Sequence, residues 1–395
     1  VPNVFFLGLV SLFNDFSSEM IQSVMPAFLT ITLGAPPVLV GLIEGFADAL
    51  ASILKIYFGW FSDKIGKRKI MAVSGYALSV STRWFLALVG NFWQVFILRS
   101  IDRIGKGLRD SPRDALISES VERKELGKSF GYHRAMDTIG ATLGPLAAVF
   151  ILPLILDDYR FLFKISFAVG ILAILTFVFV KDVPHPSNPS SLNESAMRKG
   201  SKGEGFSFSL REYSPAFKEY LLSVFLFGLG FMPIALMLLK SREVGLNGFS
   251  MPLMYFIYNL SFVIFAIPAG KLADRIGEKK VLAGGFLAAI AAYLNLAFFS
   301  SILGVVCGFI ILGVYSAMTD GVERAFASKL VPDNKLATGQ GFLNAAVGIS
   351  SLFAGIIGGT IWTKFGSSQA LIYGAVMMAI GLAVFIHLNT RKKVV

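Results

Sequence analysis

A run of charged side chains lies inside an apolar stretch in the first half of the sequence. The segment LRSIDRIGKGLRDSPRDALISES (98–120) follows the apolar NFWQVFI. Three or four residues separate five of its charges, which are Arg99, Arg103, Lys106, Asp110 and Arg113. A helix places residues with this spacing on one face. Guanidinium and ammonium groups on such a face can bind carboxylates or other anions through charge-assisted hydrogen bonds.

Ionisable side chains with helical spacing recur in three further apolar segments. These pairs are Asp15 with Glu19, Glu44 with Asp48, and Arg134 with Asp137. A carboxyl group held away from water can bind a proton, and a nearby Arg returns it to the charged form. We therefore predict a proton-binding site in the first of these segments, with Asp15 or Glu19 as the carrier.

The composition is that of a membrane protein. Hydrophobic residues make up 55% of the 395 residues and charged residues 15%, whereas soluble proteins carry roughly 25% charged residues. The apolar residues come in runs of about 20, the length that crosses a bilayer as a helix. The net charge of +11 falls mainly in short loops, which argues against nucleic acid as a partner. Cys307 is the only cysteine, so we expect no disulfide framework and no cysteine metal cluster.

Twelve apolar segments alternate with loops of two kinds. They lie at about 4–32, 38–60, 70–90, 92–118, 128–156, 160–181, 216–240, 250–270, 280–300, 302–328, 336–363 and 367–389. Every second loop is rich in Lys and Arg, and such loops stay in the cytoplasm. We therefore predict a multi-pass protein of the cytoplasmic (inner) membrane with both termini cytoplasmic. The polar stretch 182–215 reads as a cytoplasmic linker between an N-terminal six-helix bundle (1–181) and a C-terminal one (216–395).

An internal repeat and its motif resemble the major facilitator superfamily. GWFSDKIGKRK (59–69) recurs as GKLADRIGEKK (270–280), and the first copy resembles that superfamily's loop signature between helices 2 and 3. The matching positions are Gly59, Asp63, Gly66, Lys67 and Arg68, and in the second copy Gly270, Asp274 and Gly277. Arg103 with Gly107 resembles the helix-4 pattern R-x-x-x-G, and GATLGPLAA (140–148) resembles the helix-5 pattern of drug–proton antiporters.

The resemblance implies an all-α membrane protein of twelve transmembrane helices in two pseudo-symmetric six-helix bundles, with helices 1 and 4 lining a central cavity. A charge facing lipid at mid-depth costs about 2.5–3.5 kcal/mol, so the embedded charges must face a cavity or each other. The expected cavity residues are Arg99, Arg103, Lys106, Glu44, Asp48, Arg134 and Asp137, with Tyr255, Tyr258 and Asn259 on an aromatic side. Asp15 and Glu19 are expected opposite the upper part of the helix-4 stripe. A fixed ion-pair network within the first bundle would explain the same charges.

The lower end of the helix-4 stripe is predicted to close the cytoplasmic side. The repeat places Asp110 and Asp114 at positions equivalent to Asp320 and Arg324. Opposite charges are then available across the two bundles. The gate residues would be Asp110, Arg113, Asp114, Asp320, Glu323 and Arg324, with Arg113 facing Asp320 or Glu323 and Arg324 facing Asp110 or Asp114.

These features predict a secondary active transporter that works by alternating access. The helix-5 pattern favours proton-coupled efflux of an amphiphilic organic compound, whereas the basic stripe favours proton-coupled uptake of an anionic solute such as a carboxylate or metal chelate. We expect a monomer in the lipid bilayer, with protons and a small organic substrate as partners and with no cofactor or metal. A membrane enzyme would need a catalytic cluster, and the sequence shows no phosphate loop and no nucleophile–base pair. A sensor that does not transport is the remaining alternative.

Overall fold

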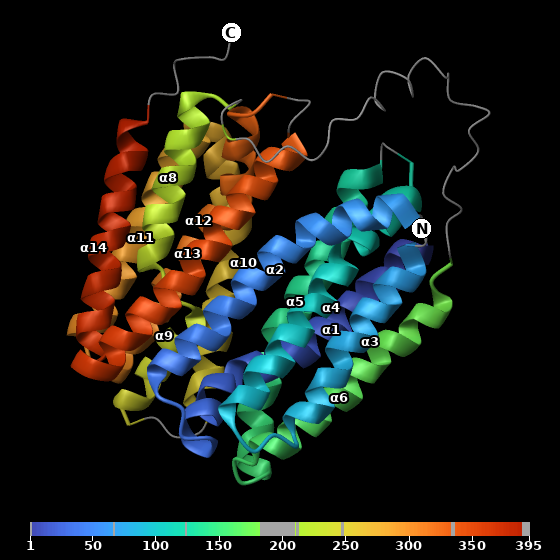
Figure 1. Ribbon diagram of the computed structural model, residues 1–395, viewed down its shortest axis with the longest axis horizontal. Coiled ribbons are helices and arrows are strands. Elements are labelled where there is room, and N and C mark those ends of the chain that lie inside the picture. The colour runs from blue at the N-terminus through green and yellow to red at the C-terminus, as the bar shows by residue number, and fades with distance from the viewer. Residues whose placement is uncertain are drawn as a thin grey trace.

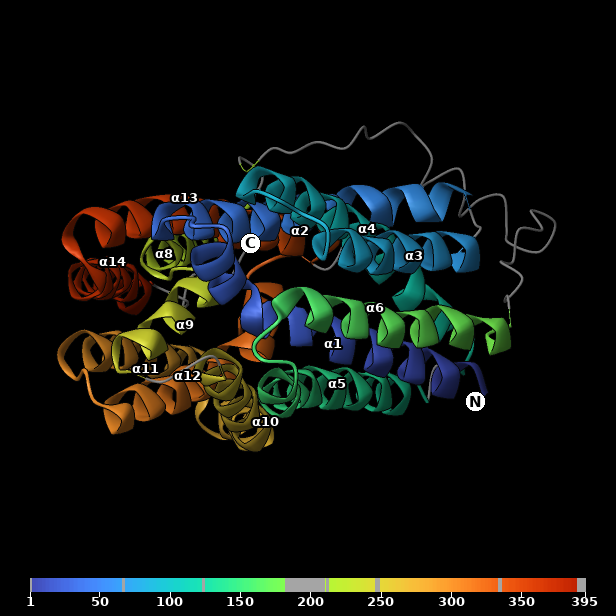
Figure 2. The ribbon, with the colours of Figure 1, turned by 90° about the horizontal axis from the view of Figure 1, so that it is seen from below.

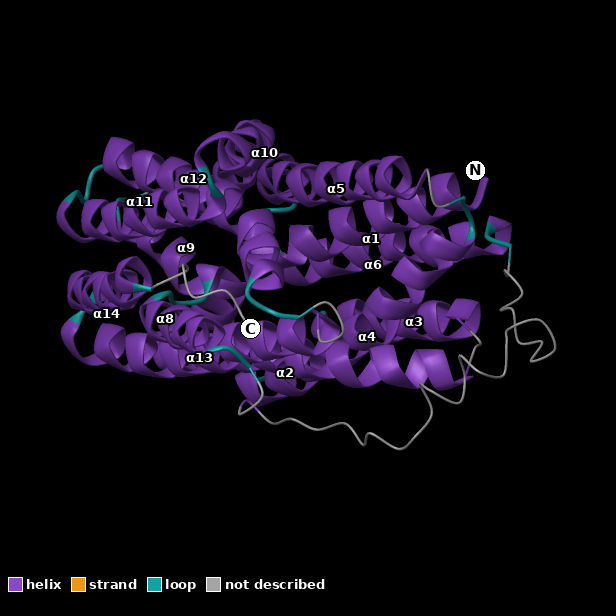
Figure 3. Cartoon of the chain, turned by 90° about the horizontal axis from the view of Figure 1, so that it is seen from above, coloured by secondary structure: helices purple, strands orange, loops and turns teal. Residues whose placement is uncertain are grey.

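A computed structural model describes residues 2–65, 68–122, 125–181, 210, 213–245, 249–332 and 336–388. These residues form helices and short connections, with no strand among them (Figure 1, Figure 3). The elements of the first half are α1 (Pro2–Ala27), η1 (Phe28–Thr32), α2 (Pro37–Ile65), α3 (Arg68–Leu86), α4 (Phe92–Glu119), α5 (Leu126–Leu154), α6 (Tyr159–Thr176) and η3 (Phe177–Phe179). Those of the second half are α8 (Pro215–Gly230), α9 (Ile234–Glu243), α10 (Ser250–Ile276), α11 (Glu278–Phe298), α12 (Ile302–Lys329), α13 (Leu336–Phe365) and α14 (Ser367–His387).

The twelve predicted segments are confirmed as helical in these residues, with one difference. The segment expected at 216–240 is broken into α8 and α9 at Phe231–Pro233. Pro233 has no N–H group to continue a helix, and the N–H of Met232 donates instead to the Tyr293 hydroxyl at 2.8 Å. The N–H group of Met232 therefore remains hydrogen-bonded inside the second bundle although the helix is broken there. Most of the predicted linker, at 182–209 and 211–212, lies outside the described residues.

The helices gather into two bundles of six spanning elements each (Figure 2). In the first bundle α1 packs against α5 and α6, and α4 packs against α2 and α3. In the second bundle α12 packs against α10 and α11, while α14 packs against α8 and α11. Ten of the described helices are long and apolar enough to cross a membrane. The helices α3 and α4 are not among the ten, and α4 is the helix that carries the charged stripe.

The two bundles meet mainly through α2 and α13. At Gly41 and Gly355 the backbones approach so closely that a Cβ atom at either position would lie 2.1 Å from the carbonyl oxygen of the other. We call the end of the molecule that holds the start of α1 and the end of α14 the terminal face. Figure 1 shows that the bundles splay apart toward the terminal face and stay together at the opposite face, where α2 begins.

Candidate functional site

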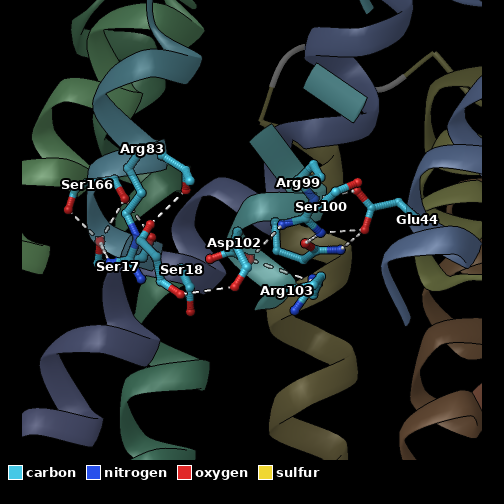
Figure 4. Close-up of polar contacts among 12 residues, drawn as sticks. Ser17, Ser18, Glu44, Arg83, Arg99, Ser100, Asp102, Arg103 and Ser166 are labelled. Carbon is cyan, nitrogen blue, oxygen red and sulfur yellow. Dashed lines mark hydrogen bonds and ion pairs between the residues drawn. The ribbon is translucent and has the colours of Figure 1, made fainter. Parts of the chain in front are cut away.

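The first polar cluster is a buried ion pair between α2 and α4. Arg99 donates to Glu44 through Nε at 3.0 Å and through Nη2 at 2.5 Å (Figure 4). Gln22 on α1 donates to Glu44 Oε2 at 3.0 Å and accepts from the Arg99 guanidinium. Only 7% of the Arg99 side chain and 2% of the Glu44 side chain are exposed. Arg99 and Glu44 thus neutralise each other inside the first bundle, although both were expected to line a cavity.

A central cavity lies between the two bundles. Its volume is about 400 Å³. The first bundle contributes Asp48, Lys55, Arg103 and Lys106 to its wall, and the second bundle contributes Phe227, Phe231, Tyr258, Tyr315 and Glu323. One side of the cavity is therefore charged and the other is mainly aromatic, as the sequence predicts for Arg103, Lys106, Asp48 and Tyr258.

The cations of the cavity differ in how well they are paired. Lys55 lies 3.3 Å from Asp110, so its charge is compensated on α4. Arg103 reaches Asp102 only at 3.9 Å, and its buried Nε has no hydrogen-bond partner (Figure 4). In the part of the chain that the structure describes, the Lys106 ammonium has neither a hydrogen bond nor an ion pair. The charged wall thus presents two cations with unused donors.

The helix α10 connects the bundles through two polar contacts. Tyr255 donates from its hydroxyl to Glu19 Oε2 at 2.6 Å, and Asn259 donates to the carbonyl oxygen of Ala141 on α5 at 3.2 Å. Tyr255 and Asn259 therefore contact the first bundle, while Tyr258, which lines the cavity, bonds to the Ser316 hydroxyl at 2.8 Å. Glu19 thus contacts the second bundle, and in the described residues its hydrogen bond is to Tyr255 and not to the helix-4 stripe.

A second cluster, on α1 and α5, holds Asp15 and Asp137. Ser11 donates to Asp137 Oδ1 at 2.5 Å, and Asn14 donates to Asp15 Oδ1 at 2.8 Å. Neither acid lines the central cavity. Asp137, which was expected in the substrate cavity, instead contacts α1 through Ser11.

Sequence reasoning assigned no role to Asn14, Arg83 and Arg109, which hold α1, α3 and α4 together. Arg83 donates to Asn14 Oδ1 at 2.6 Å and also to the Ser17 hydroxyl (Figure 4). Arg109 donates to the same Asn14 oxygen at 2.9 Å and lies over the Tyr76 ring at 4.5 Å. The signal that could have indicated this region is the helical spacing of the polar residues on α1, which are Ser11, Asp15, Ser18 and Gln22.

The predicted gate residues are paired differently from the prediction. Arg113 pairs within α4, with Asp110 at 3.8 Å and Asp114 at 2.9 Å. Arg324 lies 3.6 Å from Asp320 within α12. The expected cross-bundle pairs are wrong for this conformation, and Asp320 pairs across the interface with Arg134 instead. Glu323 lines the central cavity.

In the described part of the chain, Arg134 makes the ion pair that joins the bundles. Its Nη2 lies 2.8 Å from Asp320 Oδ2. Its Nη1 lies 3.3 Å from Asp137 Oδ2 on its own helix. Arg134 is exposed and does not line the central cavity, where it was expected.

The loop motif is only partly described. Gly59 and Asp63 lie in α2, whereas Gly66 and Lys67 fall outside the described residues. Arg68 begins α3 and pairs with Glu119 near the end of α4 at 2.9 Å.

In the second copy, Gly270 and Asp274 are exposed on α10. Gly277 ends that helix with φ +91°, a conformation that favours glycine. The described residues contain no group of three His, Cys, Asp or Glu side chains that could hold a metal ion.

Two six-helix bundles around a polar cavity, closed at one face and parted at the other, define a membrane transporter. The sequence matches the model of the Major Facilitator Superfamily over residues 7–239 and 220–394. The chain belongs to this superfamily.

Similar proteins fit that assignment. An uncharacterized MFS-type transporter, MJ1317 of Methanocaldococcus jannaschii, is 33% identical, with 96% of this chain and 92% of the relative covered. A probable 4-methylmuconolactone transporter of Cupriavidus pinatubonensis is 24% identical over 91% of this chain and 83% of its own length. The solved nucleoside transporter NupG matches with a TM-score of 0.79 at 15% identity, over 98% of this chain and 100% of that one. A POT family transporter in complex with 5-aminolevulinic acid matches with a TM-score of 0.80 at 14% identity, over 99% and 96%.

Proposed function

We propose that the protein transports a small organic anion with an apolar body through the central cavity by alternating access. The observation that carries this proposal is the unpaired ammonium of Lys106 beside the guanidinium of Arg103. Two cations with unused donors on one wall favour a carboxylate or a comparable anion. The rings of Phe231 and Tyr315, whose centroids lie 4.8 Å apart, offer an apolar surface for the rest of the solute.

The anion would enter from outside and leave into the cytoplasm. The basic loops support an orientation in the cytoplasmic membrane with the terminal face inside the cell. In that orientation the conformation described above is open to the cytoplasm. The proton gradient would drive uptake, with Asp15 or Glu19 in the proton-binding group. A relative named as a 4-methylmuconolactone transporter supports a small organic solute.

Efflux of an amphiphilic compound is the competing proposal, and it rests on the Gly144–Pro145 element of α5. Packing explains the glycines of this element. A Cβ atom at Gly140 or Gly144 would lie 2.4 Å from a backbone carbonyl oxygen of α1, at Leu12 or Phe16. The glycines thus permit close contact of α1 and α5 whatever the solute, which removes the main argument for efflux.

Binding to the purified protein tests the choice of substrate class. We expect small aromatic and aliphatic carboxylates to raise the thermal unfolding temperature, and cationic amphiphiles to have no such effect. Lys106→Gln should weaken binding of the best carboxylate about tenfold or more, the loss expected for one charged hydrogen bond of about 1.5–3 kcal/mol. Lys164→Gln makes the same change at an exposed position on α6 and should leave binding unaltered. Stabilisation by cations alone would favour efflux and overturn the proposal.

A further inference from the structure

The second bundle contributes an acid without a partner to the wall of the central cavity. Glu323 on α12 lines this cavity and is partly buried. Its backbone carbonyl oxygen accepts a hydrogen bond from the Tyr220 hydroxyl at 3.3 Å, but within the described residues its carboxyl group has neither a hydrogen bond nor an ion pair. The next residue, Arg324, pairs instead with Asp320, at 3.6 Å. The carboxyl group of Glu323 is therefore open to a ligand.

The cations with unused donors lie on the wall that the first bundle contributes to the same cavity. They are Arg103 and Lys106, both on α4. In the part of the chain that the structure describes, no ion pair joins either cation to Glu323. Opposite charges therefore line one cavity from two bundles without contacting each other. A single solute with both kinds of charge would supply a partner to each of them through charge-assisted hydrogen bonds.

The charges of the cavity wall balance in number. Lys55 is already compensated on α4, which leaves Arg103 and Lys106 against Asp48 and Glu323. A solute with one carboxylate and one amine keeps this balance. A carboxylate alone adds a net negative charge to a partly desolvated site, which weakens its binding.

Of the two acids in the wall, Glu323 is the better partner for an amine. Asp48 lies on the first-bundle wall beside the cations and accepts a hydrogen bond from Ser351 at 3.3 Å. Glu323 lies on the second-bundle wall, which also contains the rings of Phe231 and Tyr315. Aromatic faces attract ammonium groups. An amine on this side of the cavity therefore meets an unpaired carboxylate together with aromatic rings.

We propose that the transported solute is an amino-carboxylate, whose carboxylate is bound by Arg103 and Lys106 and whose amine is bound by Glu323. The first bundle holds one end of the solute and the second bundle holds the other. The carbon chain between the two ends lies along the rings of Phe231 and Tyr315. This inference rests on the carboxylate transport proposed above and adds a second charged group, so that the bound anion is one end of a zwitterion.

Pairs of ligands that differ only in the amine test this inference on the purified protein. Titration calorimetry compares β-alanine with propionate, γ-aminobutyrate with butyrate, δ-aminovalerate with valerate, and ε-aminocaproate with caproate. In at least one pair the amine should tighten binding about tenfold or more, the gain expected for one charged hydrogen bond. Acetylation of that amine removes its charge and should abolish the gain.

A substitution in the cavity wall assigns the contact. Glu323→Gln should abolish the gain from the amine, while the affinity for the simple carboxylate stays the same or rises. Glu219→Gln makes the same change at an exposed position on α8 and should keep the gain. A gain that survives in Glu323→Gln would overturn the proposal. If Glu323→Gln fails to fold, the ligand pairs decide on the parent chain alone.

The ligand pairs also separate this inference from the function on which it rests. If the simple carboxylates bind and the amine adds nothing in any pair, the amino-carboxylate is refuted and carboxylate transport stands. If neither member of any pair binds, carboxylate transport is refuted and the inference falls with it.

Discussion

At the scale of single residues, the arginines of the first bundle divide into two kinds. Arg83 and Arg99 are buried and have partners on other helices of the same bundle. Arg103 and Arg134 lie at the boundary with the second bundle, in the cavity wall and in the cross-bundle ion pair. The first kind holds the bundle together, and the second kind contacts the cavity or the other bundle.

Spacing in the sequence predicts the stripe on α4 but not which partner each cation takes. Intervals of three and four residues show that Arg99 and Arg103 share a face. They do not show how α1 and α2 are rotated against that face. For this reason Glu44 is the partner of Arg99, whereas Asp15 and Glu19 were expected opposite this part of α4.

Glu44→Gln should destabilise the protein strongly. The substitution keeps the shape of the side chain but leaves the buried Arg99 without its closest counter-ion, and breaking a buried pair costs about 3–5 kcal/mol. Unfolding by heat or denaturant in detergent measures the loss. Asp48→Asn, one turn further along α2, keeps an oxygen that can accept the 3.3 Å hydrogen bond from Ser351 and should cost less than about 1 kcal/mol. Equal stability of Glu44→Gln and the parent chain would show that the pair is not a structural brace.

At the scale of helices, apolar length predicts where elements lie, and packing decides where they break. The twelve segments follow from runs of apolar residues, and ten of them are recognisable by hydropathy alone. The charged residues of α3 and α4 keep both helices below that hydropathy criterion. The loops on either side of them still predict where the two helices lie. The break at Pro233 depends on a hydroxyl from Tyr293, which lies on another helix and which no local pattern reveals.

Gly355→Ala should disrupt the contact between α2 and α13. The added methyl group would overlap the carbonyl of Gly41, so the helices must move apart, and overpacking of this kind costs about 1–3 kcal/mol. Thermal unfolding measures this cost, and cysteine labelling at the opposite face should become faster.

The control for this substitution is Gly131→Ala. A Cβ atom at Gly131 would meet nothing within 4 Å. Because alanine is favoured over glycine inside a helix, the substitution should leave the free energy of unfolding unchanged or raise it by up to about 1 kcal/mol. Similar effects of the two substitutions would mean that α2 and α13 adjust without strain.

At the scale of the whole molecule, the structure shows one of the states that alternating access requires. The bundles are held together at the opposite face and separated at the terminal face (Figure 1). In this state Arg113 and Arg324 pair within their own helices. We expect their predicted partners across the interface in a state in which the terminal face is closed, and the gate remains a prediction for that state.

Neutralising Arg113 and Arg324 together, as Arg113→Gln with Arg324→Gln, should favour the state with the terminal face open. Each exposed pair contributes only about 0–1 kcal/mol, but a combined bias of about 1.4 kcal/mol changes a two-state population tenfold. Labelling of a cysteine at Ala325, in a Cys307→Ala chain, should become faster. Lys364→Gln removes a cation at the far end of α13 and serves as the control. Unchanged labelling would show that the arginines act only within their own bundles.

The polarity of α3 and α4 has a consequence for how the chain is made. Charged side chains within a membrane segment are costly to expose to lipid and almost always pair with one another or with other polar groups. The acceptors for Arg83 are Asn14 and Ser17 on α1, and those for Arg99 are Gln22 on α1 and Glu44 on α2. The acceptors are therefore synthesised before the donors. We therefore expect the third and fourth helices to enter the bilayer as a hairpin that docks on the first two during synthesis.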